Sequence, residues 1–207
     1  MGAALADAAV KLGHDVVIIS GPVSADYPSA ATVIPVVSTD EMLSAAVETF
    51  RSCDGAIGAA APCDYMPRFV KKEKISKTGE PLTIELIETA DVVAMLGQQK
   101  RDDQWVVGFA LETEDHRFRA TVKLQKKHCD LMVSNGPSAI DSASNDVELL
   151  GPSGELIANV RGSKAEVADR LLLEIDQRLV RLGGVAASAT DHAVARGVST
   201  PADRQDE

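Results

Sequence analysis

Val16-Val17-Ile18-Ile19 is an unbroken run of β-branched residues, and it is followed by Ser20-Gly21-Pro22. A short continuous apolar run of this kind is typical of a strand that is buried on both faces of a parallel sheet. The stretch before it, from Gly2 to Leu12, is rich in alanine and predicts a helix that ends at Gly13. A helix followed by a buried strand indicates an α/β protein.

The same alternation continues along the chain. Further strands are predicted at 33–37, 55–61, 82–87, 105–110, 130–134, 147–150 and 156–160, and helices at 40–51, 90–100, 114–128 and 163–182. We expect Thr39 and Thr89 to cap two of these helices and Ser163 to form a capping box with Glu166. The pattern predicts a Rossmann-like, doubly wound and mostly parallel sheet with right-handed crossovers. In such a sheet the strand ends after 61, 110 and 135 should line one ligand-binding crevice.

Composition limits the class of protein. The chain has 207 residues, and 45% of them are hydrophobic, a composition that suits one globular domain. We place this domain at 1–182 and expect 183–207 to be a disordered tail. The net charge of -10 argues against a general nucleic-acid binder. Cys53, Cys63 and Cys129 lack metal-site spacing, so we expect reduced thiols in a cytoplasmic protein. No apolar run has the length of a membrane span.

The segment from Gly58 to Lys77 combines two kinds of residue that suit a nucleotide. Gly58-Ala59-Ala60-Ala61-Pro62-Cys63-Asp64-Tyr65 supplies small side chains, which allow a ligand to approach the backbone closely, and then an acid. The following residues are rich in lysine, which can neutralise phosphate charge. Because 62–80 has few apolar residues, it predicts a long arm that acts as a lid.

Other candidates each have an ordinary structural reading. Lys123 and Lys127 are four residues apart and share a helix face, which can bind phosphate or simply face solvent. Asp91 lies at a helix start, where it can act at an anion site or only complement the helix dipole. Phe109 can belong to the core, and Asn135 can form a turn with Gly136. Cys63 has no neighbouring histidine, so we do not expect it to be a nucleophile.

Several segments together resemble the phosphopantothenate–cysteine ligase family, the ligase half of a bacterial bifunctional coenzyme A biosynthesis flavoprotein. The segments are Met1-Gly2-Ala3-Ala4-Leu5-Ala6, Ser20-Gly21-Pro22-Val23, Ala60-Ala61-Pro62-Cys63-Asp64-Tyr65, Lys72-Glu73-Lys74-Ile75, Val107-Gly108-Phe109-Ala110-Leu111-Glu112-Thr113, Lys127 with Asp130-Leu131, and Asn135. Their order and spacing over about residues 1–160 carry the resemblance.

The resemblance implies CTP-dependent ligation of 4′-phosphopantothenate to cysteine through an acyl-cytidylate. It also implies Mg²⁺, a homodimer, and a separate phosphopantothenoylcysteine decarboxylase, because no decarboxylase half is present in this sequence. It makes Lys74 the catalytic lysine and Asn135 a substrate-binding residue, whereas the metal ligands stay unknown. The nucleotide-binding residues that it implies are Gly58, Ala59, Ala60, Asp64, Lys74, Ala90, Asp91, Val92, Val93, Phe109, Lys123 and Lys127.

The chain departs from the family pattern in two places. It begins at the Met-Gly of what is usually a Ser-Gly-Lys-Met-Gly loop. We therefore expect the family's first strand, and an asparagine that is associated with using the acyl intermediate, to be missing from it. Gly136 stands where many members have aspartate. Two other functions stay open: an NAD(P)-dependent oxidoreductase, although no Gly-x-Gly-x-x-Gly follows a strand here, and a non-catalytic remnant that binds nucleotide.

Overall fold

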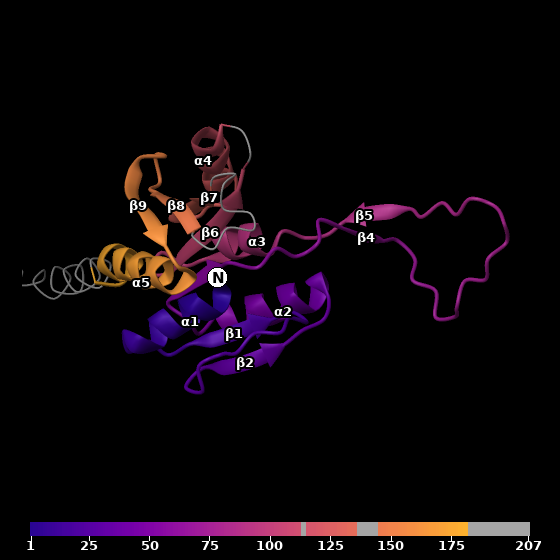
Figure 1. The fold of residues 1–207 in the computed structure, drawn as a ribbon, viewed down its shortest axis with the longest axis horizontal. Coiled ribbons are helices and arrows are strands. Elements are labelled where there is room, and N and C mark those ends of the chain that lie inside the picture. Colours follow the sequence, from indigo (N-terminus) through magenta and orange to yellow (C-terminus); the bar gives the residue numbers. More distant parts are fainter. Residues whose placement is uncertain (113–114, 136–144, 182–207) are drawn as a thin grey trace, which may run out of the picture. The chain divides into compact units, whose positions relative to one another are not determined.

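The computed structural model describes residues 1–112, 115–135 and 145–181 (Figure 1). The chain divides into two compact units, 1–172 and 173–207. The elements are α1 (Gly2–Lys11), β1 (Val17–Ser20), β2 (Thr32–Pro35), α2 (Thr39–Phe50), β3 (Gly55–Gly58), β4 (Tyr65–Pro67), β5 (Leu86–Glu88), α3 (Val92–Gln99), β6 (Trp105–Leu111), α4 (His116–Lys126), β7 (Leu131–Asn135), β8 (Asn145–Leu150), β9 (Leu156–Gly162), α5 (Lys164–Ile175) and the π-helical turn η2 (Asp176–Arg181). The expected tail at 183–207 lies outside the described residues, so the boundary at 182 stays a prediction.

The strands form a mixed arrangement rather than the single, mostly parallel sheet that the sequence predicted. β1 and β2 make a parallel pair of their own, and the main sheet has the order β3-β6-β7-β8-β9. Pairing in the main sheet is parallel from β3 to β7 and antiparallel from β7 to β9. The α/β class is therefore confirmed, but β1 and β3 do not pair with each other, and a hairpin closes the other edge.

Helices α3 and α4 pack against one face of the main sheet, and α2 packs against α3 and β1. The core that they share with the sheet consists of Ala46, Phe50, Val92, Leu96, Val106, Ala110, Ala120, Leu124, Cys129, Met132 and Leu150. These residues come from α2, α3 and α4, from β6, β7 and β8, and, for Cys129, from the turn between α4 and β7. On the opposite face Val107, Val133, Val147 and Leu149 are fully buried as well. Burial on both faces explains why these strands appear in the sequence as continuous apolar runs.

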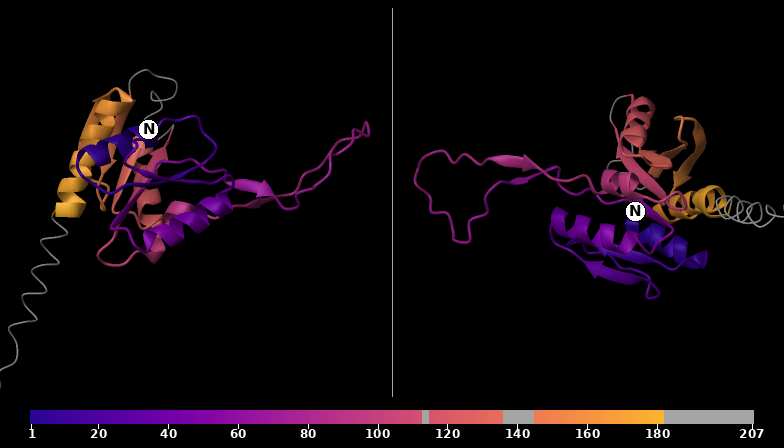
Figure 2. Two further views of the ribbon diagram at one scale, coloured as in Figure 1. Left: turned by 90° about the horizontal axis from the view of Figure 1, so that it is seen from below. Right: turned by 180° about the vertical axis from the view of Figure 1, so that it is seen from behind.

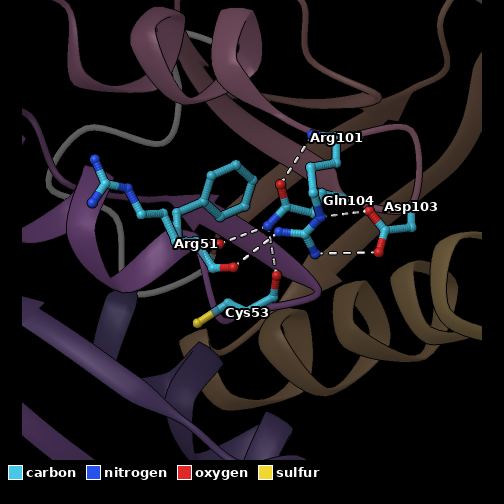
Figure 3. A network of polar contacts seen from close by, with 6 residues as sticks. Arg51, Cys53, Arg101, Asp103 and Gln104 are labelled. Atoms are coloured by element: carbon cyan, nitrogen blue, oxygen red, sulfur yellow. Dashed lines mark hydrogen bonds and ion pairs between the residues drawn. The ribbon is translucent and has the colours of Figure 1, made fainter.

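A polar network fixes the amino-terminal end of the main sheet (Figure 3). The buried Gln104 side chain donates through Nε2 to the carbonyl oxygens of Phe50, at 2.6 Å, and Cys53, at 2.7 Å. Its Oε1 accepts from the Arg101 backbone N–H, and the Arg101 guanidinium donates to the Arg51 carbonyl. These bonds satisfy carbonyls at the end of α2 that have no partner within the helix. The network therefore holds the start of β6 against the turn that leads into β3, and we read it as structural.

The sequence predicted caps for three helices, but it named the capping residue correctly only at the start of α5. Ser163 and Glu166 form the expected capping box. The cap of α2 is Ser38 and not Thr39, because the Ser38 hydroxyl accepts from Glu41 N–H. Thr89 is not a cap; its hydroxyl donates to the Cys63 carbonyl, and Asp91 caps α3 instead.

The arm is a narrow two-stranded ribbon that leaves the end of β3 and returns to the start of α3. β4, which the sequence did not predict, pairs antiparallel with β5 over three residues. Every residue from 71 to 86 is exposed, and Figures 1 and 2 show the ribbon extending away from the helices of the first unit. Among the described residues, no helix combines the length and apolar character that crossing a membrane requires.

Candidate nucleotide and substrate site

The base of the arm brings together the end of β3 and the start of α3. A Cβ on Gly58 would lie 2.3 Å from Val93 Cγ2, so only glycine allows this close approach. Thr89 ties the two sides of the base, since its N–H donates to the Asp64 carbonyl at 2.9 Å. Gly58, Ala59, Ala60, Asp64 and the segment 90–93, all predicted to bind nucleotide, therefore lie near one another.

Asp91 has two roles at the start of α3. Its Oδ1 accepts from Ala94 N–H at 3.0 Å, and its Oδ2 forms an ion pair with Lys127 Nζ at 3.0 Å. Burial alone would raise the pKa of Asp91, but the Ala94 hydrogen bond and the Lys127 ammonium outweigh it and hold the pKa below the usual value. The carboxylate thus stays ionised and holds Lys127 beside a helix N-terminus.

Lys123 is held in the same way, one turn earlier on α4. Its ammonium forms an ion pair with Glu112 Oε1, which lies just after β6. The Glu112 side chain is only 9% exposed, and this oxygen makes no well-directed hydrogen bond. Lys123 itself is 45% exposed, so its ammonium can also reach a ligand from solvent. Two lysines on one helix face are therefore directed toward the carboxyl end of the sheet.

The amino-terminal end of α4 is anchored to β8. Arg117 donates two hydrogen bonds of 2.6 Å to the Glu148 carboxylate, and His116 Nε2 lies 3.4 Å from Glu148 Oε2. The Arg117 guanidinium holds the pKa of Glu148 below its usual value, against a smaller opposing effect of burial. This pairing fixes the helix that carries Lys123 and Lys127.

The substrate candidate Asn135 ends β7, directly beside the end of β6. Leu111 pairs with Asn135, and two positions earlier Phe109 pairs with Val133 in the parallel register. Besides Glu112 Oε1, which pairs with Lys123, three buried side-chain atoms at this end of the sheet have no hydrogen-bond partner in the part of the chain that the structure describes: Ser134 Oγ, Asn135 Oδ1 and Asn145 Nδ2. Buried polar groups are nearly always paired, so such a group calls for an explanation. Gly136, the sequence departure, lies outside the described residues.

The catalytic candidate Lys74 is not brought to this cluster. It lies within the fully exposed part of the arm, between β4 and β5. Phe69 and Val70, beside it on the arm, are 78% and 84% exposed. The predicted role of Lys74 therefore stays a prediction.

The cysteines and acids show no preformed metal centre. Within the described ranges, no cluster of three or more His, Cys, Asp or Glu side chains could hold a metal ion. Burial raises the pKa of Cys129 to about 11, which makes that thiol a weak nucleophile. Cys63 is exposed, and its backbone carbonyl accepts a hydrogen bond from the Thr89 hydroxyl at the base of the arm.

Comparison with known proteins decides the family. The description "DNA/pantothenate metabolism flavoprotein C-terminal domain" belongs to the family model that matches residues 1–179. The chain belongs to this family. The resemblance found in the sequence is thus confirmed, and the matched region includes every residue predicted for the site.

Curated relatives in this family are longer proteins. The chain is 38% identical to the coenzyme A biosynthesis bifunctional protein CoaBC of Bacillus subtilis, over 84% of this chain and 44% of that protein. It is 39% identical to a cysteine/cysteine sulfinic acid decarboxylase of an unknown prokaryotic organism, over 84% of this chain and 50% of that protein. The chain spans about half the length of the curated relatives it matches.

Solved structures agree with the fold. The C-terminal domain of a CoaBC protein has a TM-score of 0.72 and 33% identity, covering 86% of this chain and 81% of that one. A Cab2 mutant in complex with phosphopantothenate-cysteine has a TM-score of 0.73 but 15% identity, so it supports the fold alone.

Sequence reasoning assigned no role to four residues of the site region. Glu112 stood only within a segment that carried the resemblance, yet it holds Lys123. Arg117 and Glu148 were not singled out, because an ion pair between residues 31 positions apart has no local signal. Asn145 was missed because its position at the start of β8 depends on strand register.

Proposed function

We propose that the chain catalyses CTP-dependent ligation of 4′-phosphopantothenate to cysteine. One observation carries this proposal: Lys127, paired with Asp91, has its ammonium group beside the α3 N-terminus, and Lys123, paired with Glu112, has its ammonium group just after the carboxyl end of β6. Positive charge beside a helix N-terminus suits a triphosphate. The family match over residues 1–179 supports the same reaction.

In the proposed reaction the carboxylate of 4′-phosphopantothenate attacks the α-phosphorus of CTP. The bond from that phosphorus to the bridging oxygen breaks, pyrophosphate leaves, and an acyl-cytidylate remains. The cysteine amine then attacks the acyl carbon, loses a proton, and CMP leaves. Activation is required because a free carboxylate is a poor electrophile. The protein contributes mainly by positioning the reactants and by stabilising charge that develops on the phosphate.

Each group of residues has a distinct part in this proposal. Lys123 and Lys127 contact the triphosphate, and the close approach at Gly58 and 90–93 accommodates the nucleoside with Phe109 and Asp64. Lys74, carried by the arm, stabilises the transition state at the α-phosphate. Asn135 contacts the phosphopantothenate.

We further propose that Mg²⁺ accompanies the nucleotide. Mg²⁺ in nucleotide enzymes is usually bound by one or two carboxylates together with phosphate oxygens. Asp91 and the buried Glu112 are carboxylates whose chemistry fits such an ion. When bound, the ion would neutralise phosphate charge.

The partner predictions extend this proposal. We propose a cytoplasmic homodimer that supplies a separate decarboxylase with its product. The exposed apolar side chains on the arm, Phe69, Val70, Leu82 and Ile84, support an association surface there. Light scattering should give the mass of two chains, and Val70→Asp should shift it toward one.

The test of function is direct product analysis. The chain is incubated with CTP, Mg²⁺, 4′-phosphopantothenate and cysteine, and phosphopantothenoylcysteine, CMP and pyrophosphate are quantified. We expect one of each product per turnover, with ATP as the comparison nucleotide. CTP binding without product would favour the non-catalytic reading. Thermal stabilisation by NAD(P) but not by CTP would favour an oxidoreductase.

A further inference from the structure

Two amide side chains at one end of the main sheet carry complementary buried atoms that have no partner among the described residues. Asn145, the first residue of β8, is only 6% exposed, and its Nδ2 donor makes no hydrogen bond within that part of the chain. Asn135, the last residue of β7, has a buried Oδ1 acceptor that also makes none. One unpaired donor and one unpaired acceptor therefore lie at adjoining strand ends.

Strand register places the two side chains on the same face. Asn135 pairs with Val147 in the antiparallel register, and Asn145 is two residues from Val147 along β8. Side chains two residues apart on a strand share a face, so Asn145 and Asn135 are diagonal neighbours. Such neighbours have Cα atoms about 7–8 Å apart, a separation that long side chains and a small group between them can span.

The chemistry of the pair selects the group that could lie between them. A carboxylate offers only acceptors and cannot satisfy Asn135 Oδ1, whereas an ammonium offers only donors and cannot satisfy Asn145 Nδ2. A secondary amide offers both, with its N–H directed at Asn135 and its carbonyl oxygen at Asn145. In the proposed reaction, 4′-phosphopantothenate contains one such amide.

We propose that Asn145 and Asn135 form an amide-binding pair that holds the secondary amide of the acid substrate. This inference rests on the proposed function and adds Asn145 to the substrate site. By gripping the chain of the substrate away from its reacting end, the pair orients the carboxylate toward the α-phosphate. Asn145 is thus a positioning residue that also discriminates between substrates.

The unpaired state of Asn145 makes a specific prediction about stability. A side chain that is buried without its hydrogen bond destabilises the free protein, so replacing it by an apolar group of similar volume should cost little. Asn145→Leu should therefore leave the thermal midpoint unchanged or raised. A structural asparagine would behave in the opposite way.

The experiment measures binding of both substrates separately by calorimetry. Asn145→Leu should weaken 4′-phosphopantothenate binding at least about tenfold, the loss expected for one hydrogen bond to a buried group, with CTP affinity unchanged. Asn145→Asp, which keeps the size but replaces the donor with an acceptor, should weaken it as well. The matched control is Asn159→Leu at an exposed asparagine on β9, which should change neither affinity.

A substrate analogue tests the partner residue. The ester analogue of 4′-phosphopantothenate, in which oxygen replaces the amide N–H, should bind the wild-type chain more weakly, and Asn135→Leu should abolish that difference. The inference would be overturned if Asn145→Leu bound 4′-phosphopantothenate as tightly as the wild-type chain does, or if it lost thermal stability together with binding of both substrates. Either result would leave the proposed function standing. A wild-type chain that binds CTP but no 4′-phosphopantothenate would reject the proposed function and the inference with it.

Discussion

Lys127 Nζ lies 3.0 Å from Asp91 Oδ2, while the other Asp91 oxygen accepts from Ala94 N–H. One carboxylate thus caps α3 and holds a lysine of α4. The backbones of the two helices are also close, since a Cβ on Gly97 would lie 2.0 Å from the Lys127 carbonyl oxygen. The nucleotide-binding candidates on two helices are therefore one structural unit.

Asp91→Ala should destabilise the chain by about 1 kcal/mol, because α3 loses its cap. Asp91→Asn keeps an acceptor for Ala94 N–H and loses only the charge, so it should cost less, as expected for a partly exposed ion pair. Urea denaturation of both variants measures the two effects. If Asp91→Asn and Asp91→Ala lowered the free energy of unfolding equally, the stabilisation would come from the ion pair with Lys127 and not from the cap.

Lys123→Ala and Lys127→Ala should each weaken CTP binding about tenfold and CMP binding much less, because CMP lacks the β- and γ-phosphates. The loss should grow at low salt, where charges are screened less. Calorimetric titration at two salt concentrations measures this. Lys126→Ala, an exposed neighbour on α4, is the control and should have little effect. Equal losses for CTP and CMP would mean that neither lysine contacts the terminal phosphates.

Lys74→Gln should slow acyl-cytidylate formation by about 10²–10³, with CTP affinity retained, because the lysine is proposed to act on charge that develops in the transition state. Pyrophosphate release from CTP and 4′-phosphopantothenate without cysteine measures this step. Lys72→Gln, two residues away on the exposed arm, is the matched control. Parental rates in Lys74→Gln would remove this residue from the mechanism.

Glu148 should make a pH-dependent contribution to stability. Its pKa in the folded chain lies below the ordinary value of 4.5, because Arg117 favours the charged form. The contribution is therefore fully present above about pH 4.5 and is lost as pH falls through the lowered pKa.

Denaturation of wild type and Glu148→Gln at several pH values tests this. We expect Glu148→Gln to be less stable near neutral pH by up to about 1 kcal/mol, with the difference disappearing in acid. Glu48→Gln, at an exposed acid on α2, should show no such difference. If the difference in stability between wild type and Glu148→Gln stayed the same in acid, the effect of the substitution would come from packing and not from charge.

The local elements were predictable because their causes are local. The run Val16-Val17-Ile18-Ile19 predicted a strand that the structure has at 17–20, and the Ser163–Glu166 capping box lies where the pattern placed it. The small residues around Gly58 and the pair Lys123 and Lys127 were singled out from local patterns, and their part in a nucleotide site stays a prediction. Errors of one or two residues, as at Thr39 and Thr89, arose because several nearby hydroxyls and carboxylates can serve as a cap.

The tertiary structure alone decided the relations between distant residues. Whether β1 joins the main sheet, which carboxylate holds Lys123, and which faces Asn135 and Asn145 share all depend on strand register and helix packing. By itself the sequence determined the α/β class, most of the order of elements and the exposed arm, since periodicity and composition are properties of short segments. Ion pairs and unpaired buried atoms are properties of side chains brought together across many positions, and only the folded chain specifies them.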